Sequence, residues 1–493
     1  MNKSFSLLFF TFFLNSSCAT FKTPNNPCVS DLKTYPNLSA FIQDMPKGGD
    51  LHSHLQGIPY AENLLSYVND RPYFYNPETH MVLFNKEEGS IPLNKVIENP
   101  KMKYELIKAW SALDYSGRHG HDHFFNAFTK FKVISSSGVK ADILYEGLER
   151  AKNQNVSYLE IMVNPLNDEL REIIRKTKLN HDIKNEMDLI TLKKLYMKKG
   201  FSKFTRNLLK DTDKLEKSLE GKLGFNPFSV NESHPITLRF IYQAPRNEER
   251  KHVVFGRLLL GFHLASLDKR YVGVNLVTPE NGKISLQDYD IHMQMIRYLK
   301  KVYPTVSVSL HAGEVTENLA DKEKTHSNIY KAVYIAGAKR IGHGVNVKNE
   351  LDSDTLLKNL HKDNIYVEIN LTSNDFILNV KGSEHPLRLY MNYKVPVGLS
   401  TDDEGVLRTN MNKEFLKGIK DQNLSYSELK TMVRNTLQYS FISGESLWSS
   451  GDYSQKTDAC KNACNDFIKN NNKAMLQWKL EKHLELFEKK YCQ

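Results

Sequence analysis

His52 and His54 follow an apolar segment and are separated by a single residue. On a strand, residues two apart point to the same face, so both imidazoles can be presented to one point. This spacing also arises by chance on protein surfaces. Here, however, the pair ends an apolar segment and precedes Gly57, a residue typical of turns. We therefore interpret the two histidines as a candidate pair of metal ligands.

Three further clusters of ionisable side chains also follow short apolar segments. They are His311 with Glu314, His343 between two glycines, and the adjacent pair Asp402 and Asp403. Three histidines and one aspartate would suit a borderline divalent cation such as zinc, with a water in an open position. A single cluster of this kind is as often a buried, hydrogen-bonded polar group as it is part of a metal or catalytic site. Four clusters, each at the end of an apolar segment, favour a shared metal-binding site.

The segments that precede these clusters read as strands, because they are short, apolar and rich in β-branched residues. Amphipathic, helix-like segments lie between several of them, at residues 286–303, 328–336 and 353–363. Eight strands alternating with helices predict an α/β fold, the (β/α)₈ or TIM barrel, in which the C-terminal strand ends meet at one mouth. That geometry would bring the four clusters together. The eight predicted strands are residues 49–55, 157–163, 235–242, 271–277, 305–310, 339–342, 365–371 and 395–400.

The order of these segments predicts how the chain is organised. We expect a signal peptide at residues 1–17, an N-terminal arm at 18–45, the barrel at 46–435 and a C-terminal helical extension at 436–493. Two long connections, residues 56–156 and 164–234, read as insertions into the barrel, and the second is charged and helical in pattern. Near the C-terminus, helices are predicted at residues 412–420, 425–441 and 459–490.

Composition excludes several classes of protein. The chain has 493 residues, of which 40% are hydrophobic and 25% charged, and this rules out a mainly disordered or collagen-like chain. Beyond the N-terminus no apolar run is long enough for a transmembrane span. The formal net charge is +10, which is typical of a lysine-rich solvated surface and also of a protein attracted to anionic surfaces.

The N-terminus resembles an export signal. Lys3 is followed by the apolar residues 7–14 and by small residues before Cys18. Cys18 stands where a lipidated cysteine would follow a cleaved signal, although Asn15 replaces the usual leucine, so a lipid anchor and an ordinary cysteine both stay open. We expect a secreted, periplasmic or lipid-anchored protein.

The remaining four cysteines fit an oxidising compartment. They are Cys28, Cys460, Cys464 and Cys492, and their even number is typical of disulfide pairing. The spacing of Cys460 and Cys464 lacks the second ligand pair that a structural zinc site needs. We expect disulfides that tie the N-terminal arm to the C-terminal helices.

The ordered motifs resemble those of the adenosine deaminase family, from about residue 46 to residue 410. The signal peptide points to its secreted branch, the adenosine deaminase-related growth factors, or to an exported bacterial relative. The motifs are HSHLQG at 52–57, LHAGE at 310–314, RIGHG at 340–344, HPLR at 385–388 and STDD at 400–403.

The resemblance implies a role for each matching residue. One zinc ion would be held by His52, His54, His311 and Asp402. Glu314 would protonate purine N1, His343 would orient the hydroxide that attacks C6, and Asp403 would bond to N7. The resemblance thus implies conversion of adenosine or 2′-deoxyadenosine to inosine or 2′-deoxyinosine plus ammonia, in which an acid of raised pKa makes C6 electrophilic.

The chain departs from the family pattern where the sugar and the exocyclic groups are contacted. Gln56 stands where an acidic residue is common, Asn275 replaces an aspartate, Thr278 replaces a glycine and Glu404 replaces a proline. We keep Gln56 and Thr278 as candidate substrate contacts. These departures leave the metal ligands and the acid unaffected.

One segment of the first insertion, residues 120–125, has two interpretations. It reads as a helix N-terminus capped by Asp122, or as a lid over the substrate with Trp110 or Phe124 stacked on the base.

Other functions stay open at this stage. They are a deaminase of adenine, AMP or a modified adenosine, and a secreted binding or signalling protein without turnover. No phosphate-binding motif is identifiable, and no lysine lies in residues 271–277 to bridge two metals, which favours one metal and a neutral nucleoside substrate. The sequence predicts no nucleic-acid partner and leaves the oligomeric state open, a homo-oligomer included.

Overall fold

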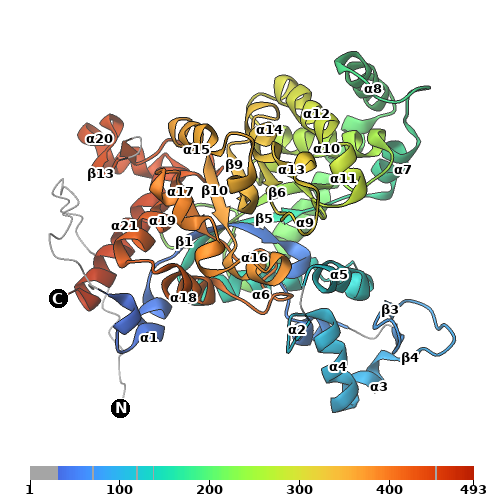
Figure 1. Cartoon of the computed structure of the whole chain (residues 1–493), viewed down its shortest axis with the longest axis horizontal. Coiled ribbons are helices and arrows are strands. Elements are labelled where there is room, and N and C mark those ends of the chain that lie inside the picture. Colours follow the sequence, from blue (N-terminus) through green and yellow to red (C-terminus); the bar gives the residue numbers. More distant parts are fainter. Residues whose placement is uncertain (1–30, 69–71, 118–119, 137, 450–451, 493) are drawn as a thin grey trace, which may run out of the picture.

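The central sheet is a nearly closed barrel. The computed structural model describes residues 31–68, 72–117, 120–136, 138–449 and 452–492. Among these residues, eight parallel strands pair in chain order, and a bridge between Ser53 and Asp402 joins the two edges (Figure 1). The predicted (β/α)₈ fold is therefore confirmed. The strands are β1 (Gly48–His54), β5 (Val156–Val163), β6 (Thr237–Pro245), β7 (Tyr271–Val277), β8 (Ser307–Ala312), β9 (Arg340–His343), β10 (Tyr366–Ile369) and β11 (Val397–Leu399).

Both faces of the barrel strands are covered, which explains why their sequences read as apolar runs. Every residue of β1 and β5 is buried, as expected for a parallel sheet packed on both faces. Helix α10 (Lys251–Leu267) packs on β6 and β7, and α19 (Tyr426–Gln438) packs on β1 and β11. The core thus lies between the strands and this outer ring of helices.

Most predicted helices lie close to their expected positions. They are α12 (Tyr289–Val302), α14 (Asn328–Tyr334), α15 (Ser353–Lys362), α18 (Met411–Gln422) and α19. The segment at 459–490, predicted as one helix, is instead two helices, α20 (Asp458–Lys469) and α21 (Asn472–Tyr491). The break falls at Asn470 and Asn471, because the Asn471 side chain accepts the Ala474 amide and caps a new helix.

The two insertions carry secondary structure of their own. The first holds α2 (Ala61–Ser66), a small sheet of β2 (Phe74–Tyr75), β3 (Val82–Leu83) and β4 (Ile91–Pro92), and the helices α3 (Leu93–Glu98), α4 (Pro100–Trp110), α5 (His121–Ser135) and α6 (Lys140–Asn153). Figure 1 shows that α3, α4 and the small sheet project away from the barrel. The second insertion is helical, as predicted. It holds α7 (Asp168–Lys176), α8 (Glu186–Lys198) and α9 (Phe201–Leu223), and all three pack on α10.

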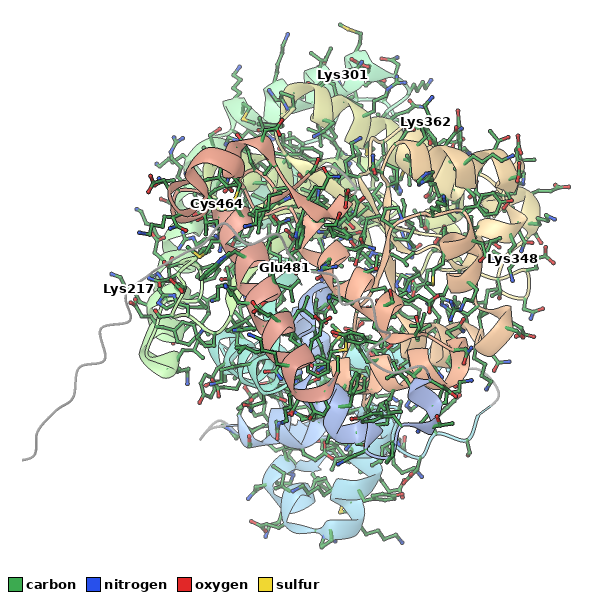
Figure 2. All side chains as sticks on the ribbon, turned by 90° about the vertical axis from the view of Figure 1, so that its left-hand side faces the viewer. Lys217, Lys301, Lys348, Lys362, Cys464 and Glu481 are labelled. Carbon is green, nitrogen blue, oxygen red and sulfur yellow. A yellow bond between two sulfur atoms is a disulfide. The ribbon has the colours of Figure 1, made fainter. Side chains whose placement is uncertain are left out.

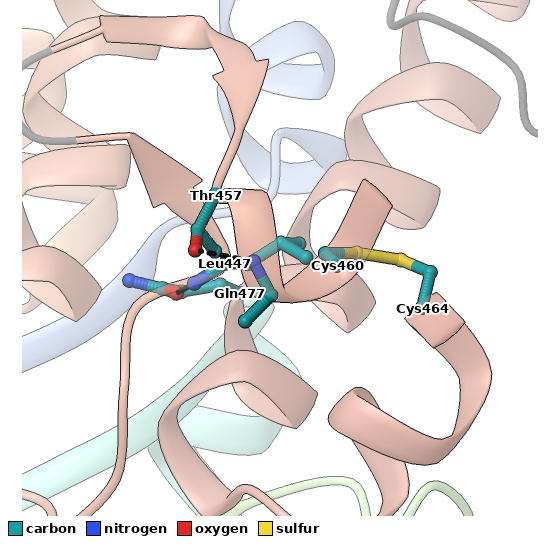
Figure 3. Close-up of a disulfide and its surroundings, with 6 residues drawn as sticks. Leu447, Thr457, Cys460, Cys464 and Gln477 are labelled. Carbon is teal, nitrogen blue, oxygen red and sulfur yellow. Dashed lines mark hydrogen bonds between the residues drawn. A yellow bond between two sulfur atoms is a disulfide. The ribbon is translucent and has the colours of Figure 1, made fainter. Parts of the chain in front are cut away.

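A disulfide lies within α20. Cys460 and Cys464, one helical turn apart, are joined to each other (Figure 3). The expectation that these two cysteines tie the N-terminal arm to the C-terminal helices is therefore wrong. Cys492 is also disulfide-bonded. Cys18 and Cys28, and with them the predicted signal peptide and lipid anchor, lie outside the described residues.

The positive charge is spread over the surface. Lys217, Lys301, Lys348 and Lys362 are exposed and point outward from different elements (Figure 2). In contrast, Glu481 is buried and pairs with Arg434, with 2.7 Å between Oε1 and Nε. Of the described helices, none has the length and apolar character needed to cross a bilayer.

Candidate metal centre and its surroundings

The two histidines of β1 point into the barrel mouth. His52 Nδ1 lies 2.6 Å from Glu368 Oε2, and His54 Nδ1 lies 2.7 Å from Gln243 Oε1. Each imidazole therefore uses Nδ1 in a contact with another barrel strand, β10 or β6, and leaves Nε2 directed at a common point. His52 Nε2 is buried and makes no hydrogen bond within the described residues, although Asp402 Oδ1 lies 3.5 Å away. A buried ring nitrogen aimed at other potential ligand atoms fits the role of a metal ligand.

His311, from β8 across the mouth, and Asp402, which is bridged to β1, complete the cluster. His311 is the penultimate residue of β8. Its Nδ1 lies 2.9 Å from Asn275 Oδ1, and its Nε2 is 3.2 Å from His54 Nε2. Asp402 Oδ1 lies 3.3 Å from His54 Nε2 and 3.5 Å from His52 Nε2. One ligand atom from each of the four residues lies within 4.8 Å of the others. The arrangement fits a four-ligand site for a borderline cation.

The charges of these groups agree with that interpretation. Burial and the neighbouring histidines hold the pKa of His311 well below its usual value, so its Nε2 lone pair is free. Burial opposes ionisation of Asp402, but the nearby His52 and His54 outweigh it and hold the pKa of Asp402 well below its usual value. A carboxylate therefore faces the three nitrogens.

Glu314 and His343 form a second cluster next to the first. Glu314 Oε1 lies 3.6 Å from His343 Nε2, and ligand atoms of both residues lie within 4.8 Å of Asp402. Burial, with a smaller contribution from Asp402, raises the pKa of Glu314 to about 8. Burial lowers the pKa of His343 to about 3. The site thus offers a carboxylic acid that keeps its proton at neutral pH beside an uncharged imidazole.

Glu314 is held by a carboxylate that sequence reasoning missed. Glu280 Oε2 accepts the Glu314 amide at 2.8 Å, and Glu280 Oε1 accepts the Gly313 amide at 3.2 Å and the Asn328 side chain at 2.6 Å. Gly313 has φ +76°, which lets the chain turn sharply after β8. Glu280 therefore fixes the backbone of the turn that carries Glu314.

Asp403 points toward the loop after β1. A Cβ on Gly57 would overlap Asp403 Oδ1, so only glycine leaves room for this carboxyl group. Burial and the adjacent Asp402 raise the pKa of Asp403 well above its usual value. Its Oδ1 is buried without a hydrogen-bond partner among the described residues. Asp403 can therefore donate a proton to a ligand acceptor.

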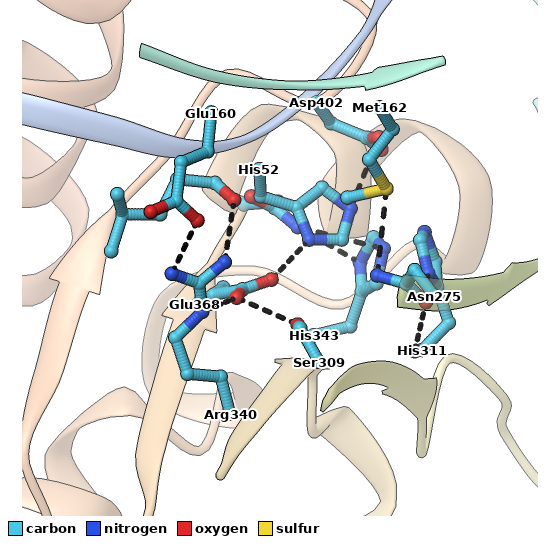
Figure 4. Close-up of polar contacts among 12 residues, drawn as sticks. His52, Glu160, Met162, Asn275, Ser309, His311, Arg340, His343, Glu368 and Asp402 are labelled. Carbon is cyan, nitrogen blue, oxygen red and sulfur yellow. Dashed lines mark hydrogen bonds and ion pairs between the residues drawn. The ribbon is translucent and has the colours of Figure 1, made fainter. Parts of the chain in front are cut away.

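A buried charge network supports the cluster from inside the barrel (Figure 4). Arg340 pairs with Glu368 at 2.7 Å and with Glu160 at 2.6 Å, and Ser309 Oγ donates to Glu368 at 2.8 Å. All of these charged side chains are fully buried. Sequence reasoning missed this network. The available signal was a charged residue inside each of three apolar strands, because such residues are almost never buried unless paired.

Three residues at strand ends have a left-handed backbone. Thr278, His343 and Asp402 have φ of +80°, +69° and +60°, a region that side chains other than glycine enter at a cost. Thr278 accepts the Asn247 amide at its hydroxyl, at 3.2 Å, and the Arg246 side chain at its carbonyl, at 2.9 Å. These bonds hold the turn that follows β7.

The remaining predicted contacts lie farther out. Gln56 is exposed and lines a cavity of about 130 Å³. Trp110 is buried in the first insertion, where its Nε1 donates to the His80 carbonyl at 3.0 Å and its ring packs against Phe131. The other residues of the cavity are Phe128, Thr129, Phe131, Lys132 and Ser135.

The segment at 120–125 begins a helix, as one of its two interpretations predicts. Helix α5 starts at His121 after Gly120, but without a side-chain cap, so the predicted capping by Asp122 is wrong. Phe124 is buried. The stacking of Trp110 or Phe124 on a base stays a prediction.

Known proteins are similar to this chain in sequence and in fold. The sequence model described as adenosine deaminase matches residues 228–447. An adenosine deaminase of Clostridium kluyveri is 23% identical over 414 residues, which cover 83% of this chain and 94% of that protein. The similarity thus extends beyond the matched segment to most of the barrel.

Solved structures agree on the fold. The Arabidopsis N6-mAMP deaminase superposes with a TM-score of 0.55 at 18% identity and covers 90% of this chain and 99% of that one. An adenine deaminase of Arthrobacter aurescens gives 0.54 at 16%, with 89% and 99% covered. Together with the ordered cluster of His52, His54, His311 and Asp402, the sequence matches support membership of the adenosine deaminase family, and the solved structures show the shared fold.

Proposed function

We propose that this protein is a zinc-dependent adenosine deaminase that converts adenosine and 2′-deoxyadenosine to inosine and 2′-deoxyinosine with release of ammonia. One observation carries the proposal. Three imidazole nitrogens and the Asp402 carboxylate converge on one point, and a carboxylic acid whose pKa is raised to about 8 lies beside them. A bound zinc ion would supply a water nucleophile of lowered pKa at this point.

Each nearby side chain has a task in that reaction. Glu314 keeps a proton at neutral pH and can give it to purine N1, which makes C6 electrophilic. Asp403, also protonated, can donate a hydrogen bond to N7, an acceptor. Water adds at C6, and the amino group then leaves as ammonia. The buried walls exclude other water from the reacting atoms.

A second candidate substrate class carries a 5′-phosphate on the sugar, with or without a methyl group on N6. The cavity beside Gln56 also contains Lys132, which is exposed. A cation there would suit a 5′-phosphate, and the Arabidopsis relative is named as an N6-mAMP deaminase. A deaminase of AMP or N6-methyl-AMP would keep the same metal ligands and the same acid.

A direct assay separates these candidates. Zinc-loaded protein is incubated with adenosine, 2′-deoxyadenosine, adenine, AMP and N6-methyl-AMP, and released ammonia or methylamine is measured. We expect the highest kcat/KM with adenosine or 2′-deoxyadenosine. A clear preference for AMP would transfer the proposal to the phosphorylated class, and no turnover of any substrate would favour a binding protein on this fold.

We also propose that the protein works outside the cytoplasm. The support is sequence alone, since residues 1–30 lie outside the described part of the chain. Mass spectrometry of the mature N-terminus tests this. A mature chain that starts at Cys18 supports export, a lipid mass on Cys18 supports the anchor, and an intact Met1 contradicts both.

A further inference from the structure

A chain of hydrogen bonds runs behind His343, on the side away from the metal ligands. The Leu387 amide lies 3.1 Å from His385 Nδ1, and His385 Nε2 lies 3.0 Å from Asn374 Oδ1. Asn374 Nδ2 in turn lies 2.9 Å from His343 Nδ1. The three side chains are buried. They come from the end of β9, from α16 (Leu371–Leu378) and from the segment before α17 (Leu387–Asn392).

The backbone fixes the first proton in this chain. Leu387 N–H is a donor and cannot accept, so His385 Nδ1 must be the acceptor. In an uncharged imidazole the proton then sits on Nε2. His385 is uncharged, because burial lowers its pKa to about 3. His385 Nε2–H therefore donates to the Asn374 side chain.

The second and third protons follow from the first. The atom of Asn374 that faces His385 accepts a hydrogen bond, so it is the carbonyl oxygen Oδ1. The amide is thereby oriented with its NH₂ group toward His343, and Asn374 Nδ2 donates to His343 Nδ1. A second amide donor, Asn370 Nδ2, lies 3.4 Å from His343 Nδ1 and 3.5 Å from His343 Nε2, and both contacts are longer than the 2.9 Å contact of Asn374. With Nδ1 used as the acceptor of the shortest bond, the single proton of the neutral His343 ring sits on Nε2.

The protonated nitrogen faces the reaction centre. His343 Nε2 lies 3.6 Å from Glu314 Oε1 and belongs to the group of atoms around Asp402. We propose that Asn374 and His385 are positioning residues that fix His343 as the Nε2–H tautomer, so that it presents a hydrogen-bond donor to the nucleophilic oxygen and cannot accept that oxygen's proton at Nε2. The catalytic role of this tautomer rests on the proposed deamination.

This assignment divides the labour at the site. A donor at Nε2 stabilises negative charge on the attacking oxygen as it adds to C6. The proton of the incoming water must then go to another group, and Glu314, once it has given its own proton to N1, is the neighbouring carboxylate that can take it.

The test uses variants that change the tautomer without touching a metal ligand. In Asn374→Asp a carboxylate accepts from His343 Nδ1–H and shifts the ring proton away from Nε2. His385→Ala frees the Asn374 amide to rotate, whereas His385→Gln keeps a side-chain donor in its place. Asn379→Gly, at the left-handed residue that ends the same helix, is the control, because Asn379 is exposed and takes no part in the chain.

Two readouts are measured on zinc-loaded protein. Long-range ¹⁵N–¹H spectra of histidine-labelled protein, assigned with a His343→Gln variant, report which ring nitrogen carries the proton. Steady-state kinetics report kcat and KM separately. We expect Nε2–H in the parent, Nδ1–H in Asn374→Asp, and a kcat reduced about 10²-fold with little change in KM. His385→Gln should retain more activity than His385→Ala, and Asn379→Gly should match the parent.

The outcomes are separable from those of the proposed function. A parent spectrum with His343 protonated at Nδ1 overturns the inference even if the enzyme deaminates adenosine well. So does an Asn374→Asp variant with unchanged kcat and an unchanged His343 spectrum. A protein that turns over no aminopurine defeats the proposed function, while its spectrum still decides the tautomer.

Discussion

Glu368 Oε2 lies 2.6 Å from His52 Nδ1, and neither side chain has any contact with solvent. Burial alone would raise the pKa of Glu368, but Arg340 and His52 outweigh it and hold the pKa below its usual value. An ionised carboxylate therefore orients the first candidate ligand and makes its Nε2 a better donor to a cation.

Removal of that charge should weaken metal binding more than it weakens the fold. In Glu368→Gln we expect zinc affinity to fall about 10–100-fold, measured by competition with a chromophoric chelator. Glu160→Gln is the matched control, because Glu160 pairs with the same Arg340 but contacts none of the candidate metal ligands. Equal affinity losses in the two variants would show that the effect is only structural.

Metal binding should release a proton. Burial lowers the pKa of His52, but the nearby carboxylates of Asp402 and Glu368 outweigh burial and raise the pKa to about 10. The metal-free protein therefore holds a proton on His52 at pH 7, and a metal must displace it. Affinity should rise by about tenfold per pH unit for each proton displaced below pH 10. Calorimetry in buffers of different ionisation enthalpy measures the proton count, and heats that do not depend on the buffer would contradict the prediction.

Glu314→Gln should keep its metal and lose turnover. An amide cannot supply the proton, so we expect kcat to fall about 10²–10⁴-fold at full zinc occupancy. In the parent the protonated form is the active one, so activity is present below the pKa of Glu314 and lost as pH rises through it. That pKa is raised to about 8 in the metal-free protein, and a bound dication would lower it. Near-normal kcat in zinc-loaded Glu314→Gln would exclude the acid role.

A substitution at Asn275 should increase the affinity of the site for a metal ion. Its Oδ1 accepts both the backbone and the Nδ1 protons of His311, at 3.1 and 2.9 Å, and its Nδ2 faces Met162 Sδ. Asn275→Asp would turn these into charge-assisted bonds and make His311 more basic. We expect metal loss to a chelator to slow by about tenfold. Unchanged loss would mean that this contact only orients the ring.

Lys132 should determine how strongly the protein prefers a substrate with a 5′-phosphate over one without it. Reversal of its charge in Lys132→Glu should lower kcat/KM for AMP about tenfold relative to adenosine, if the cavity at Gln56 takes the 5′ end of the substrate. Lys101→Glu, on the exposed face of α4, makes the same change in net charge away from the cavity. Identical ratios in the two variants would place the 5′ end elsewhere.

The sequence was sufficient for the barrel and for the four ligand-type clusters, because both rest on local patterns. Apolar β-branched segments form buried strands, and His52 and His54 share a face because of their spacing. The mouth of a parallel barrel then brings distant strand ends together without further information.

The sequence was insufficient wherever a partner lies far along the chain. Glu368 is 316 residues from His52, and no local pattern pairs them. Two local features were also missed. Cys460 pairs with Cys464 one helical turn away, and the Asn471 side chain caps a new helix, which apolar periodicity does not report. Trp110 was considered as a stacking partner for the base because it is aromatic. The sequence could not show which residues surround it, because its neighbours in the insertion come together only in the folded chain.

The left-handed backbone at His343 and Asp402 has an evolutionary consequence. Each such residue costs of the order of 1–3 kcal/mol that glycine would not incur, while the folded chain as a whole is only marginally stable. Selection for folding alone would therefore replace both side chains with glycine or asparagine. A descendant freed from its chemistry should lose these two positions early and melt at a higher temperature.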